Sequence, residues 1–490
     1  MNSAVHHQTF LRLVCCALLA WLFLSATHAA ETSRPNIIFI LADDLGINDL
    51  ACYGRREHRT PHLDQLARDG TRFTSAYCAQ PICSPSRAAI LTGLAPARLH
   101  LTTFLPGRAD APSQKLLHPK INQQLPLEHT TLAEALKKEG YATACVGKWH
   151  LGGKGFQPSD QGFDFIHTGR ANTKPDDTEG GKGEYDLTRA AMNFIETNRA
   201  RPFFLYLPHN TPHIAYSAKT NLVAKNAGAF EPVYAAVIET MDDTVGLLLA
   251  KLDALGLRSN TLVIFTSDNG GLHLPEGGHP RITDNAPFRA GKGFLYEGGL
   301  RVPLIVRWPG RIPASRVTDA PVINTDWLPT LLELAGAAPL KNLDGESFSA
   351  LLTGGAARAR KFFWHFPHYT NQGGRPGGAV RDGDWKFIEH YDTGTARAEL
   401  YDLARDLGET NNLAAQEPKR ADEMRRALTK WLAETGAQTN APNPNFNPAL
   451  WKNLYEETDP SRYSPIAARA AQHARMAAWR RQMNAVLPKN

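Results

Sequence analysis

Short apolar runs alternate with amphipathic stretches over the first three quarters of the chain. The runs have the length and uninterrupted apolar character of strands buried on both faces of a parallel sheet. They lie at residues 36–41, 203–207, 261–266 and 303–306, with a weaker one at 142–146. Helical spacing of apolar residues marks 63–68, 132–139, 233–255 and 326–334. This alternation predicts an α/β fold with a large mixed, mainly parallel sheet flanked by helices.

The pattern changes near residue 356. Short antiparallel strands, joined by turns that contain Gly and Asp, are predicted at residues 379–381, 385–390 and 399–403, and a helix at 418–434. We interpret residues 356–440 as a smaller C-terminal α+β domain of antiparallel strands and a helix, next to a large domain at 30–355. Residues 441–490 then form a linker, Pro- and Asn-rich at 441–445, and a basic tail.

The start of the chain has the pattern of a targeting segment. An apolar run at residues 11–25 includes Arg12 near its start and is followed by small residues. This pattern predicts a secretory signal peptide over residues 1–29, cleaved after Ala29. The alternative is an uncleaved anchor, but the run is shorter than the ~20 apolar residues of a membrane span. We therefore expect an exported protein, periplasmic or secreted, without stable membrane insertion.

Composition narrows the class of protein. The chain has 490 residues, of which 42% are hydrophobic, and a formal net charge of +6. This length suffices for two or three domains. The charge is too small for a dedicated nucleic-acid binder, so we expect no nucleic-acid partner. Six cysteines are too few for a scaffold built on disulfides. An enzyme or a binding protein remains.

Polar clusters directly follow three of the predicted strands. Asp43 and Asp44 follow the first strand, residues 148–150 follow the weaker one, and Asp268 and Asn269 follow the run at 261–266. Ligands of such sheets bind beyond the carboxyl ends of the strands, so we expect the clusters to converge on one edge. Their oxygens suit Ca²⁺ or Mg²⁺, although an acidic pair at a loop start is also common as a helix cap or a solvated turn.

A cysteine opens the segment CSPSRAAILTG at residues 83–93. On the residues alone, Cys83 stands at the start of a helix that Ser86 caps and Arg87 continues. A helix N-terminus lowers the pKa of a thiol, which would make Cys83 reactive. The alternative is a structural thiol beside a proline turn.

The segment resembles the C-x-P-S-R…L-T-G signature of the type I, formylglycine-dependent sulfatases of the alkaline-phosphatase-like superfamily. Other segments resemble the same family in the same order; they are residues 34–44, 60–64, 147–152, 211–213 and 292–299. The resemblance extends from about residue 34 to residue 413. It implies an alkaline-phosphatase-like fold, a sulfatase catalytic domain at 30–355 and the activity of a sulfuric ester hydrolase.

The resemblance also implies a cofactor and a modification. A formylglycine-generating enzyme would convert Cys83 to Cα-formylglycine (3-oxoalanine). One Ca²⁺ would be held by an oxygen of the modified Cys83 and by four side chains: Asp43, Asp44, Asp268 and Asn269. The hydrated aldehyde would attack sulfur and form a sulfoenzyme intermediate.

Five further catalytic residues follow from the resemblance. Arg87 would orient and stabilise the hydrate, and Lys148 and Lys292 would bind the sulfate oxygens. His150 would take a proton from the hydrate as the sulfoenzyme breaks down. His213 would donate a proton to the leaving oxygen.

Other functions remain open alternatives at this point. Phosphodiesterases and phosphonate hydrolases of the same superfamily have nearly the same metal loops. An unmodified Cys83 would leave a calcium-dependent protein that binds sulfated glycans without turnover. A purely structural extracellular protein is a third alternative.

The substrate is inferred from aromatic and basic residues. Residues 364–369 and 373–375 would lie on a lid over the site, and the insert at 272–289 adds His273, His279 and Arg281. Such side chains favour a sulfated carbohydrate, a glycan or an oligosaccharide, as the substrate. Alternatively, they form only the aromatic core and turns of the small domain.

The last thirty residues carry the positive excess of the chain. Six basic residues and no acidic residue follow Asp459; they are Arg462, Arg469, Arg475, Arg480, Arg481 and Lys489. Residues 466–486 are Ala-rich and predict a helix. It could bind an anionic glycan or a membrane surface, or it could pack on the body with its arginines in solvent.

Overall fold

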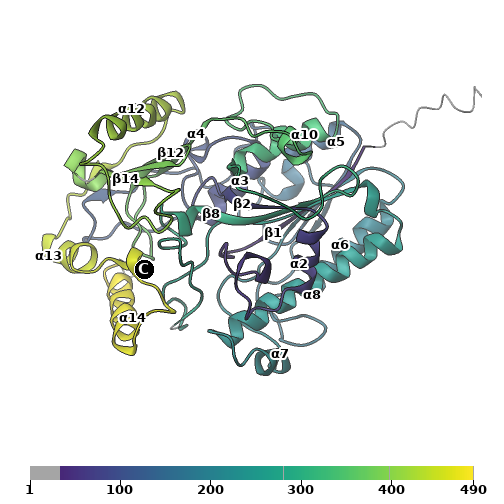
Figure 1. Cartoon of the computed structure of the whole chain (residues 1–490), viewed down its shortest axis with the longest axis horizontal. Helices are drawn as coiled ribbons and strands as arrows, with labels where there is room; N and C mark the ends of the chain where they lie inside the picture. Colours follow the sequence, from purple (N-terminus) through teal and green to yellow (C-terminus); the bar gives the residue numbers. More distant parts are fainter. Residues whose placement is uncertain (1–33, 280, 397, 489–490) are drawn as a thin grey trace, which may run out of the picture. The chain divides into compact units, whose positions relative to one another are not determined.

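One mixed sheet of nine strands organises the chain, in the order β10-β2-β8-β7-β1-β6-β4-β5, with β9 paired to β2. The structure is a computed structural model that describes residues 34–279, 281–396 and 398–488, and Figure 1 shows its arrangement. The predicted signal peptide at residues 1–29 lies outside the described residues. Residues 35–490 form one compact unit.

The centre of the sheet matches the prediction. Its fully buried strands are β1 (Asn36–Ala42), β4 (Ala142–Val146), β6 (Phe203–Pro208), β7 (Thr261–Ser267) and β8 (Arg301–Arg307). The strands β1, β4, β6 and β7 run parallel, and β8 is antiparallel to β7 and β2. The predicted mixed, mainly parallel sheet is therefore confirmed.

The apolar pattern missed four strands at the ends of the sheet. They are β2 (Thr71–Tyr77), β5 (Phe165–His167), β9 (Arg316–Thr318) and β10 (Val322–Ile323). β5, β9 and β10 have only two or three residues, and β2 mixes polar and apolar side chains. An apolar run is the mark of a strand that is covered on both faces, and such short or mixed strands lack it.

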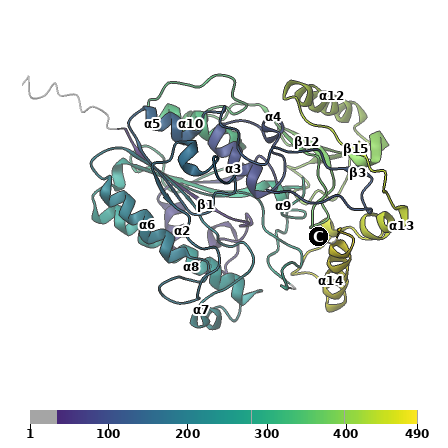
Figure 2. The same ribbon diagram turned by 180° about the vertical axis from the view of Figure 1, so that it is seen from behind.

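Helices cover both faces of the sheet (Figures 1 and 2). One face carries α3 (Cys83–Thr92), α5 (Leu132–Lys138) and α10 (Trp327–Leu334). The other carries α2 (Pro61–Arg68), α6 (Glu184–Thr197) and α8 (Pro232–Ala254). Successive side chains of β1 alternate between two hydrophobic clusters, one on each face, because strand side chains have a period of two.

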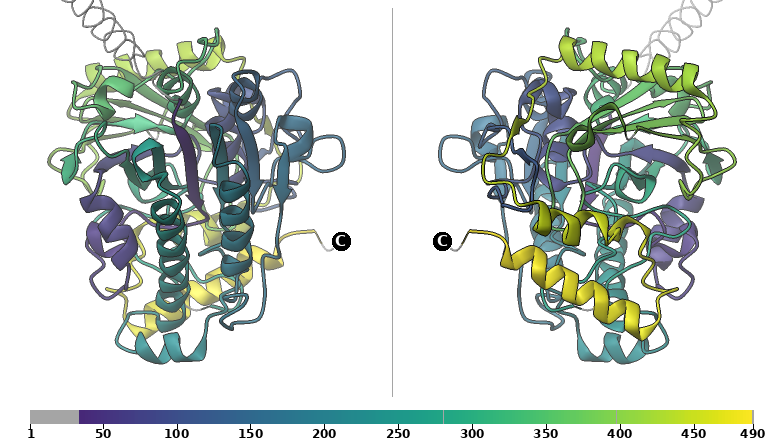
Figure 3. Two further views of the ribbon diagram at one scale, coloured as in Figure 1. Left: turned by 90° about the vertical axis from the view of Figure 1, so that its right-hand side faces the viewer. Right: turned by 90° about the vertical axis from the view of Figure 1, so that its left-hand side faces the viewer.

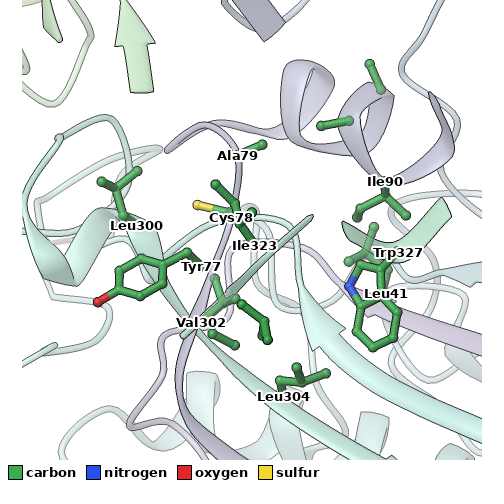
Figure 4. Packing of buried hydrophobic residues seen from close by; sticks show 14 of the residues in the cluster. Leu41, Tyr77, Cys78, Ala79, Ile90, Leu300, Val302, Leu304, Ile323 and Trp327 are labelled. Carbon is green, nitrogen blue, oxygen red and sulfur yellow. The ribbon is translucent and has the colours of Figure 1, made fainter. Parts of the chain in front are cut away.

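Packing on the α3 side fixes that helix against the sheet. Ile90 of α3 lies beside Leu41 of β1 and Trp327 of α10 in one buried cluster (Figure 4). The first residue of α3 is Cys83, so this packing also fixes the position of the cysteine. Short helices complete the chain: α4 (Pro96–Leu99), α7 (Thr220–Lys225), α9 (Glu297–Leu300), α11 (Ser349–Leu352) and α13 (Pro448–Trp451).

The small C-terminal sheet is also confirmed. Its four antiparallel strands are β11 (Lys361–Phe366), β12 (Gly377–Asp382), β13 (Trp385–His390) and β14 (Ala398–Asp402). The helix α12 (Pro418–Glu434) packs on it and has the predicted bounds.

The predicted aromatic lid is wrong. Trp364 is 1% exposed in the hydrophobic core, and its indole N–H donates to the carbonyl oxygen of Cys78 at 2.9 Å. His365, His368 and Tyr369 are buried as well. The alternative, buried core aromatics, is what the structure shows, although Trp364, Phe366 and Tyr369 pack in the main hydrophobic cluster and not in the separate cluster under α12.

We expect Trp364→Ala to act on stability. Removing a buried indole should lower the free energy of unfolding by about 3–5 kcal/mol, because the cavity collapses only in part. Chemical denaturation measures this change. An equal stability combined with an altered substrate profile would instead favour the lid.

The segment at 441–445 is not a free linker. β15 (Ala441–Pro442) pairs with β3 (Leu116–Leu117), and the Asn443 amide donates to the carbonyl oxygens of Ala111 and Gln114. These bonds fasten the segment to the body, so its composition misled the prediction.

The basic tail contains the predicted helix, α14 (Ala470–Ala485). Met476, Trp479 and Met483 bury one side of it in the main hydrophobic cluster. Arg475 and Arg481 are exposed, whereas Arg480 is buried. The alternative of a packed helix is confirmed, with Arg480 as an exception. Among the described residues, none of the helices combines the length and the apolar character that crossing a membrane requires.

Candidate functional site

The register of two neighbouring strands brings the predicted acids together. β1 and β7 pair in parallel with Ala42 opposite Ser267, so Asp43 and Asp268 leave the sheet side by side. The backbone N–H of Asp44 donates to the Asp268 carboxylate at 3.1 Å. The predicted convergence of polar clusters on one sheet edge is confirmed.

Cys83 enters this cluster from the first turn of α3. Its Sγ lies 3.4 Å from a carboxylate oxygen of Asp43 and 3.8 Å from one of Asp44. One possible ligand atom from each of four buried residues lies within 4.8 Å of the others; the four are Asp43, Asp44, Cys83 and Asp268. Such a group of donors could hold a metal ion.

Three cations face the three carboxylates. Arg87, fully buried, donates from Nε to Asp268 at 2.9 Å and from Nη1 to the carbonyl oxygen of Lys148 at 2.9 Å. The Nζ of Lys148 lies 2.7 Å from Asp43, and the Nζ of Lys292 lies 2.6 Å from Asp44. The structure thus brings all three predicted cations into one network.

The network shifts the pKa values of the three acids in different directions. Burial would raise the pKa of Asp43, but Lys148 and the neighbouring cations hold it well below its usual value. The same balance with Lys292 lowers the pKa of Asp44. For Asp268, burial and the charge of Asp43 outweigh Arg87 and raise the pKa to about 7.

The donor set fits a hard divalent cation. Asn269 donates from Nδ2 to Asp44 at 2.8 Å, while its Oδ1 is buried without a hydrogen-bond partner among the described residues. A buried acceptor without a partner is costly and marks a place for a ligand. Three carboxylates and an amide oxygen are the ligands that Ca²⁺ and Mg²⁺ prefer. The residues present therefore fit a cation of this class.

Two histidines stand on either side of the cluster. His150 has its Nε2 at 3.0 Å from the carbonyl oxygen of Leu105, and its Nδ1 is buried without a partner among the described residues. Burial and the charge of Lys148 lower the pKa of His150 to about 4. His213 has its Nε2 3.6 Å from Asp44, and burial and Lys292 lower its pKa.

Backbone strain coincides with the site. Asp44 has a φ of 68° and His150 a φ of 60°, a left-handed conformation that residues other than glycine seldom adopt. Each such residue costs about 1–3 kcal/mol and persists only where surrounding contacts hold it. The fold thus holds both side chains in the site at a cost to stability.

Two expectations about the cysteine segment are wrong. The helix begins at Cys83 as expected, but its N-cap is Ile82 and not Ser86. Ser86 is buried one turn on and accepts a hydrogen bond from Asn324 at 2.8 Å. Burial raises the pKa of the Cys83 thiol well above its usual value and outweighs the cations nearby. Position at a helix N-terminus therefore does not make this thiol acidic.

The insert at 272–289 contributes less than expected. His273 is buried, and its Nε2 lies 3.1 Å from the carbonyl oxygen of Pro460. Arg281 stacks on Phe230 at 5.0 Å from the ring centroid. Only His279 lies next to the 211–216 segment, with its ring centroid 4.6 Å from that of Tyr216.

Sequence reasoning missed a buried acid behind the site. Glu184, at the start of α6, accepts a hydrogen bond from Thr211 at 2.9 Å and so holds the turn that carries His213. Burial raises the pKa of Glu184 to about 7. A single acidic residue at a helix start is common on solvated surfaces, so the sequence offered no signal for this role.

Known proteins match both the sequence and the geometry. A family model described as Sulfatase matches residues 35–337, and one described as N-sulphoglucosamine sulphohydrolase, C-terminal, matches residues 290–438. Arylsulfatase A of Homo sapiens is 34% identical to the chain over 85% of the chain and 90% of the relative. N-acetylgalactosamine-6-sulfatase of Canis lupus familiaris is 35% identical over 69% of each.

A solved structure agrees with these relatives. The structure of Ps i-CgsB in complex with k-i-k-neocarrahexaose superposes with a TM-score of 0.71 at 29% identity, and the match covers 82% of this chain and 93% of that chain. The Sulfatase model alone matches more than half of the chain. The chain therefore belongs to the sulfatase family and is a sulfuric ester hydrolase.

Proposed function

We propose that the chain hydrolyses sulfate monoesters of a carbohydrate, with Cys83 converted to formylglycine and one Ca²⁺ held by Asp43, Asp44, Asp268 and Asn269. One observation carries the proposal: Cys83 lies buried among three carboxylates and three cations at the edge of the sheet. The hydrate of formylglycine would supply two hydroxyls on one carbon, one to attack sulfur and the other to release sulfate. Bound Ca²⁺ would supply positive charge to the sulfate oxygens.

The cations of the chain would bind and orient the ester. A sulfate monoester is an anion, so it repels an anionic nucleophile unless nearby charge compensates. Lys148 and Lys292 reach the cluster from opposite loops and pair with different carboxylates. Once a divalent cation shares those carboxylates, the two ammonium groups are available for sulfate oxygens. Arg87 fixes Asp43 and Asp268, which lie 2.8–3.4 Å from its Nη2.

The histidines would move protons from opposite sides. Since Nε2 of His150 donates to the Leu105 carbonyl, its Nδ1 is left as an acceptor inside the site. This arrangement suits a base that takes a proton from the hydrate. The Nδ1 of His213 donates to the carbonyl oxygen of Ile214 at 2.6 Å, so its Nε2 would carry the transferred proton only in the imidazolium form, which the charge of Asp44 at 3.6 Å favours.

We expect His213→Ala to separate two kinds of substrate. A sugar alkoxide is a poor leaving group and needs a proton, whereas a nitrophenolate does not. Loss of the proton donor should lower kcat on a sugar sulfate by about 10²–10⁴-fold and that on 4-nitrophenyl sulfate much less. The comparison of both rates in the variant is the measurement. An equal loss on the two esters would remove His213 from this role.

The carbohydrate part of the proposal is supported by relatives. N-acetylgalactosamine-6-sulfatase is named for a sugar sulfate, and Ps i-CgsB was solved with a neocarrahexaose. Desulfation of a panel of defined sulfated mono- and disaccharides tests it, with 4-nitrophenyl sulfate and a phosphonate monoester as the comparison. Turnover of the phosphonate in preference to every sulfate would support the phosphonate hydrolase alternative.

The proposal includes export and maturation. Residues 1–29 would direct the chain to the periplasm or outside the cell, and a formylglycine-generating enzyme would act on Cys83. N-terminal sequencing of the exported protein should begin at residue 30. Mass spectrometry of the peptide with Cys83 should show the aldehyde in place of the thiol. A retained thiol in a preparation with full turnover would overturn this part.

A further inference from the structure

A loop after β7 lies at the rim of the catalytic cluster. A Cβ built on Gly277 would lie 3.2 Å from Cδ1 of Ile214, the residue that follows His213. The backbone N–H of Tyr216 lies 3.5 Å from Nε2 of His279. The loop of residues 275–279, here called the rim loop, is therefore packed against the turn that carries His213.

The rim loop is also linked to the opposite wall of the site. The carboxylate of Glu276 accepts a hydrogen bond from the Gln372 amide at 2.6 Å. A Cβ built on Gly293 would lie 2.9 Å from Oε1 of Gln372, and Gly293 follows Lys292 directly. Burial would lower the pKa of Lys292, but nearby negative charges, chiefly Asp44 and to a smaller extent Glu276, raise it well above its usual value. The rim loop thus contacts the turn that carries His213 and, through Gln372, the segment that carries Lys292.

The tail helix α14 brings an arginine to the rim loop. Nη2 of Arg480 lies 3.2 Å from the Glu276 carboxylate, and Nη1 donates to Asn484 at 2.6 Å. Arg480 is 7% exposed, and its Nε has no hydrogen-bond partner among the described residues. Figure 3 shows α14, in yellow, crossing the end of the molecule toward which β1 points. Both family models match only residues before α14, so Arg480 lies outside the matched segments, whereas Glu276 lies inside the first of them.

A second arginine faces the same helix. Nη2 of Arg108 donates to the carbonyl oxygen of Met483, one turn after Arg480, at 3.1 Å. Nε and Nη1 of Arg108 are buried without a partner among the described residues. Burial lowers the pKa of Arg108, the nearby Tyr455 hydroxyl offsets this in part, and the charge of Arg480 lowers the pKa further. Arg108 stands three residues after Leu105, the partner of His150.

These two residues, here called the arginine pair, have buried donors without a hydrogen-bond partner in the described part of the chain. A guanidinium is charged at all ordinary pH values and offers five N–H groups in a planar fork. Buried donors of this kind are almost always paired, so three unpaired N–H positions next to one site require an acceptor from elsewhere. Sulfate and carboxylate oxygens match the fork best.

A cavity is available next to Arg480. It measures about 400 Å³ and opens between the rim loop and α14. Its charged lining residues are Glu276, Arg480 and Arg481, so its net charge is positive. The positive charge of this cavity favours a sugar unit with an acidic substituent. A positively charged group would be repelled by Arg480 and Arg481.

We propose that the arginine pair forms a subsite for a second anionic group of the substrate: Arg480 lines the cavity, and Arg108 adds a second positive charge where it contacts the same helix at Met483. The group is a sulfate or a carboxylate on a sugar next to the one that loses its sulfate. The subsite rests on the carbohydrate sulfatase function proposed above, and it adds a substrate class: oligosaccharides with more than one acidic group.

The test compares disaccharides that share the same cleaved sulfate. One has a neutral second sugar, one carries a second sulfate and one a carboxylate. The wild-type enzyme should have the higher kcat/KM for at least one acidic disaccharide. Arg480→Gln and Arg108→Gln should each lower the ratio of acidic to neutral kcat/KM by about 10- to 100-fold, because each removes charge-assisted hydrogen bonds. The two acidic substrates tell whether sulfate or carboxylate is bound.

Matched variants keep the test decisive. Arg475→Gln removes the same charge from an exposed position of the same helix and should leave the ratio unchanged. Arg480→Lys serves as the test if Arg480→Gln does not fold. It keeps the charge beside Glu276 but loses the planar fork of N–H groups, so it should also lower the ratio of acidic to neutral kcat/KM.

Two failures are distinguishable. If the wild type hydrolyses 4-nitrophenyl sulfate but none of the disaccharides or other sugar sulfates, the carbohydrate function is wrong. If it hydrolyses the disaccharides and the arginine variants keep the wild-type ratio, or lose all substrates equally, the subsite is wrong.

Discussion

Cys83→Ala should lower sulfatase turnover by at least about 10⁴-fold, the scale on which enzymes lose activity with their nucleophile. The side chain is the part of the cluster that the proposed mechanism uses to form a bond to sulfur. Its neighbours, Asp43 and Asp44, stay in place because β1 and β7 hold them, independently of the thiol. The loss should therefore appear in kcat, with the thermal unfolding temperature close to that of the wild type.

A second cysteine gives the control. Cys52 is half-buried and packs against the hydrophobic cluster on the α2 side of the sheet. Cys52→Ala should keep sulfatase turnover within a small factor. Substantial turnover of Cys83→Ala, measured on the same ester, would contradict the formylglycine assignment.

Removal of the metal should have an effect of similar size. Without a cation, three buried carboxylates compete for three cations of the protein, and Lys148 and Lys292 stay paired with Asp43 and Asp44. Chelation should abolish turnover, and added Ca²⁺ should restore it. Calcium should also raise stability, by about 2.7 kcal/mol at a concentration a hundred times its Kd.

A ligand variant separates the two readouts. Asp268→Asn keeps the size of the side chain but replaces a negatively charged ligand by a neutral one. Arg87, which lies 2.8 Å from Asp268, also loses a negative partner. We expect weaker turnover and a smaller rise of unfolding temperature with Ca²⁺. Full activity of a preparation shown by elemental analysis to hold no metal would refute the site.

The cluster of carboxylates and cations around Cys83 was predictable because it depends on short motifs at the ends of strong apolar strands. Asp43 follows a run that is buried on both faces, and parallel pairing makes the ends of neighbouring strands meet. The family resemblance then assigned Arg87 and Lys292, which no spacing rule would have selected. The arrangement of the site thus followed from local pattern and family motif together.

Other features depend on tertiary contacts that the pattern does not contain. The sequence does not decide whether Trp364 lies on the surface or in the core. The pairing of β11 in the small sheet decides it. Serine is a common helix N-cap, which made Ser86 a candidate, but the helix begins three residues before it, at Cys83. Arg480 looks like its exposed neighbour Arg481, and only the packing of Trp479 and Met483 decides which one is buried.

The pairing of β1 with β7 also has a kinetic consequence. Arg87 and Asp268, which close over Cys83, lie 181 residues apart in the chain. At about 5–20 residues per second, a ribosome needs about 9–36 s to add that length. Cys83 is 2% exposed once the sheet has formed, so an enzyme that modifies its side chain must act before β7 docks. In a chain that folds during synthesis, this interval would limit the fraction in which the proposed conversion of Cys83 takes place, and slower translation should increase that fraction.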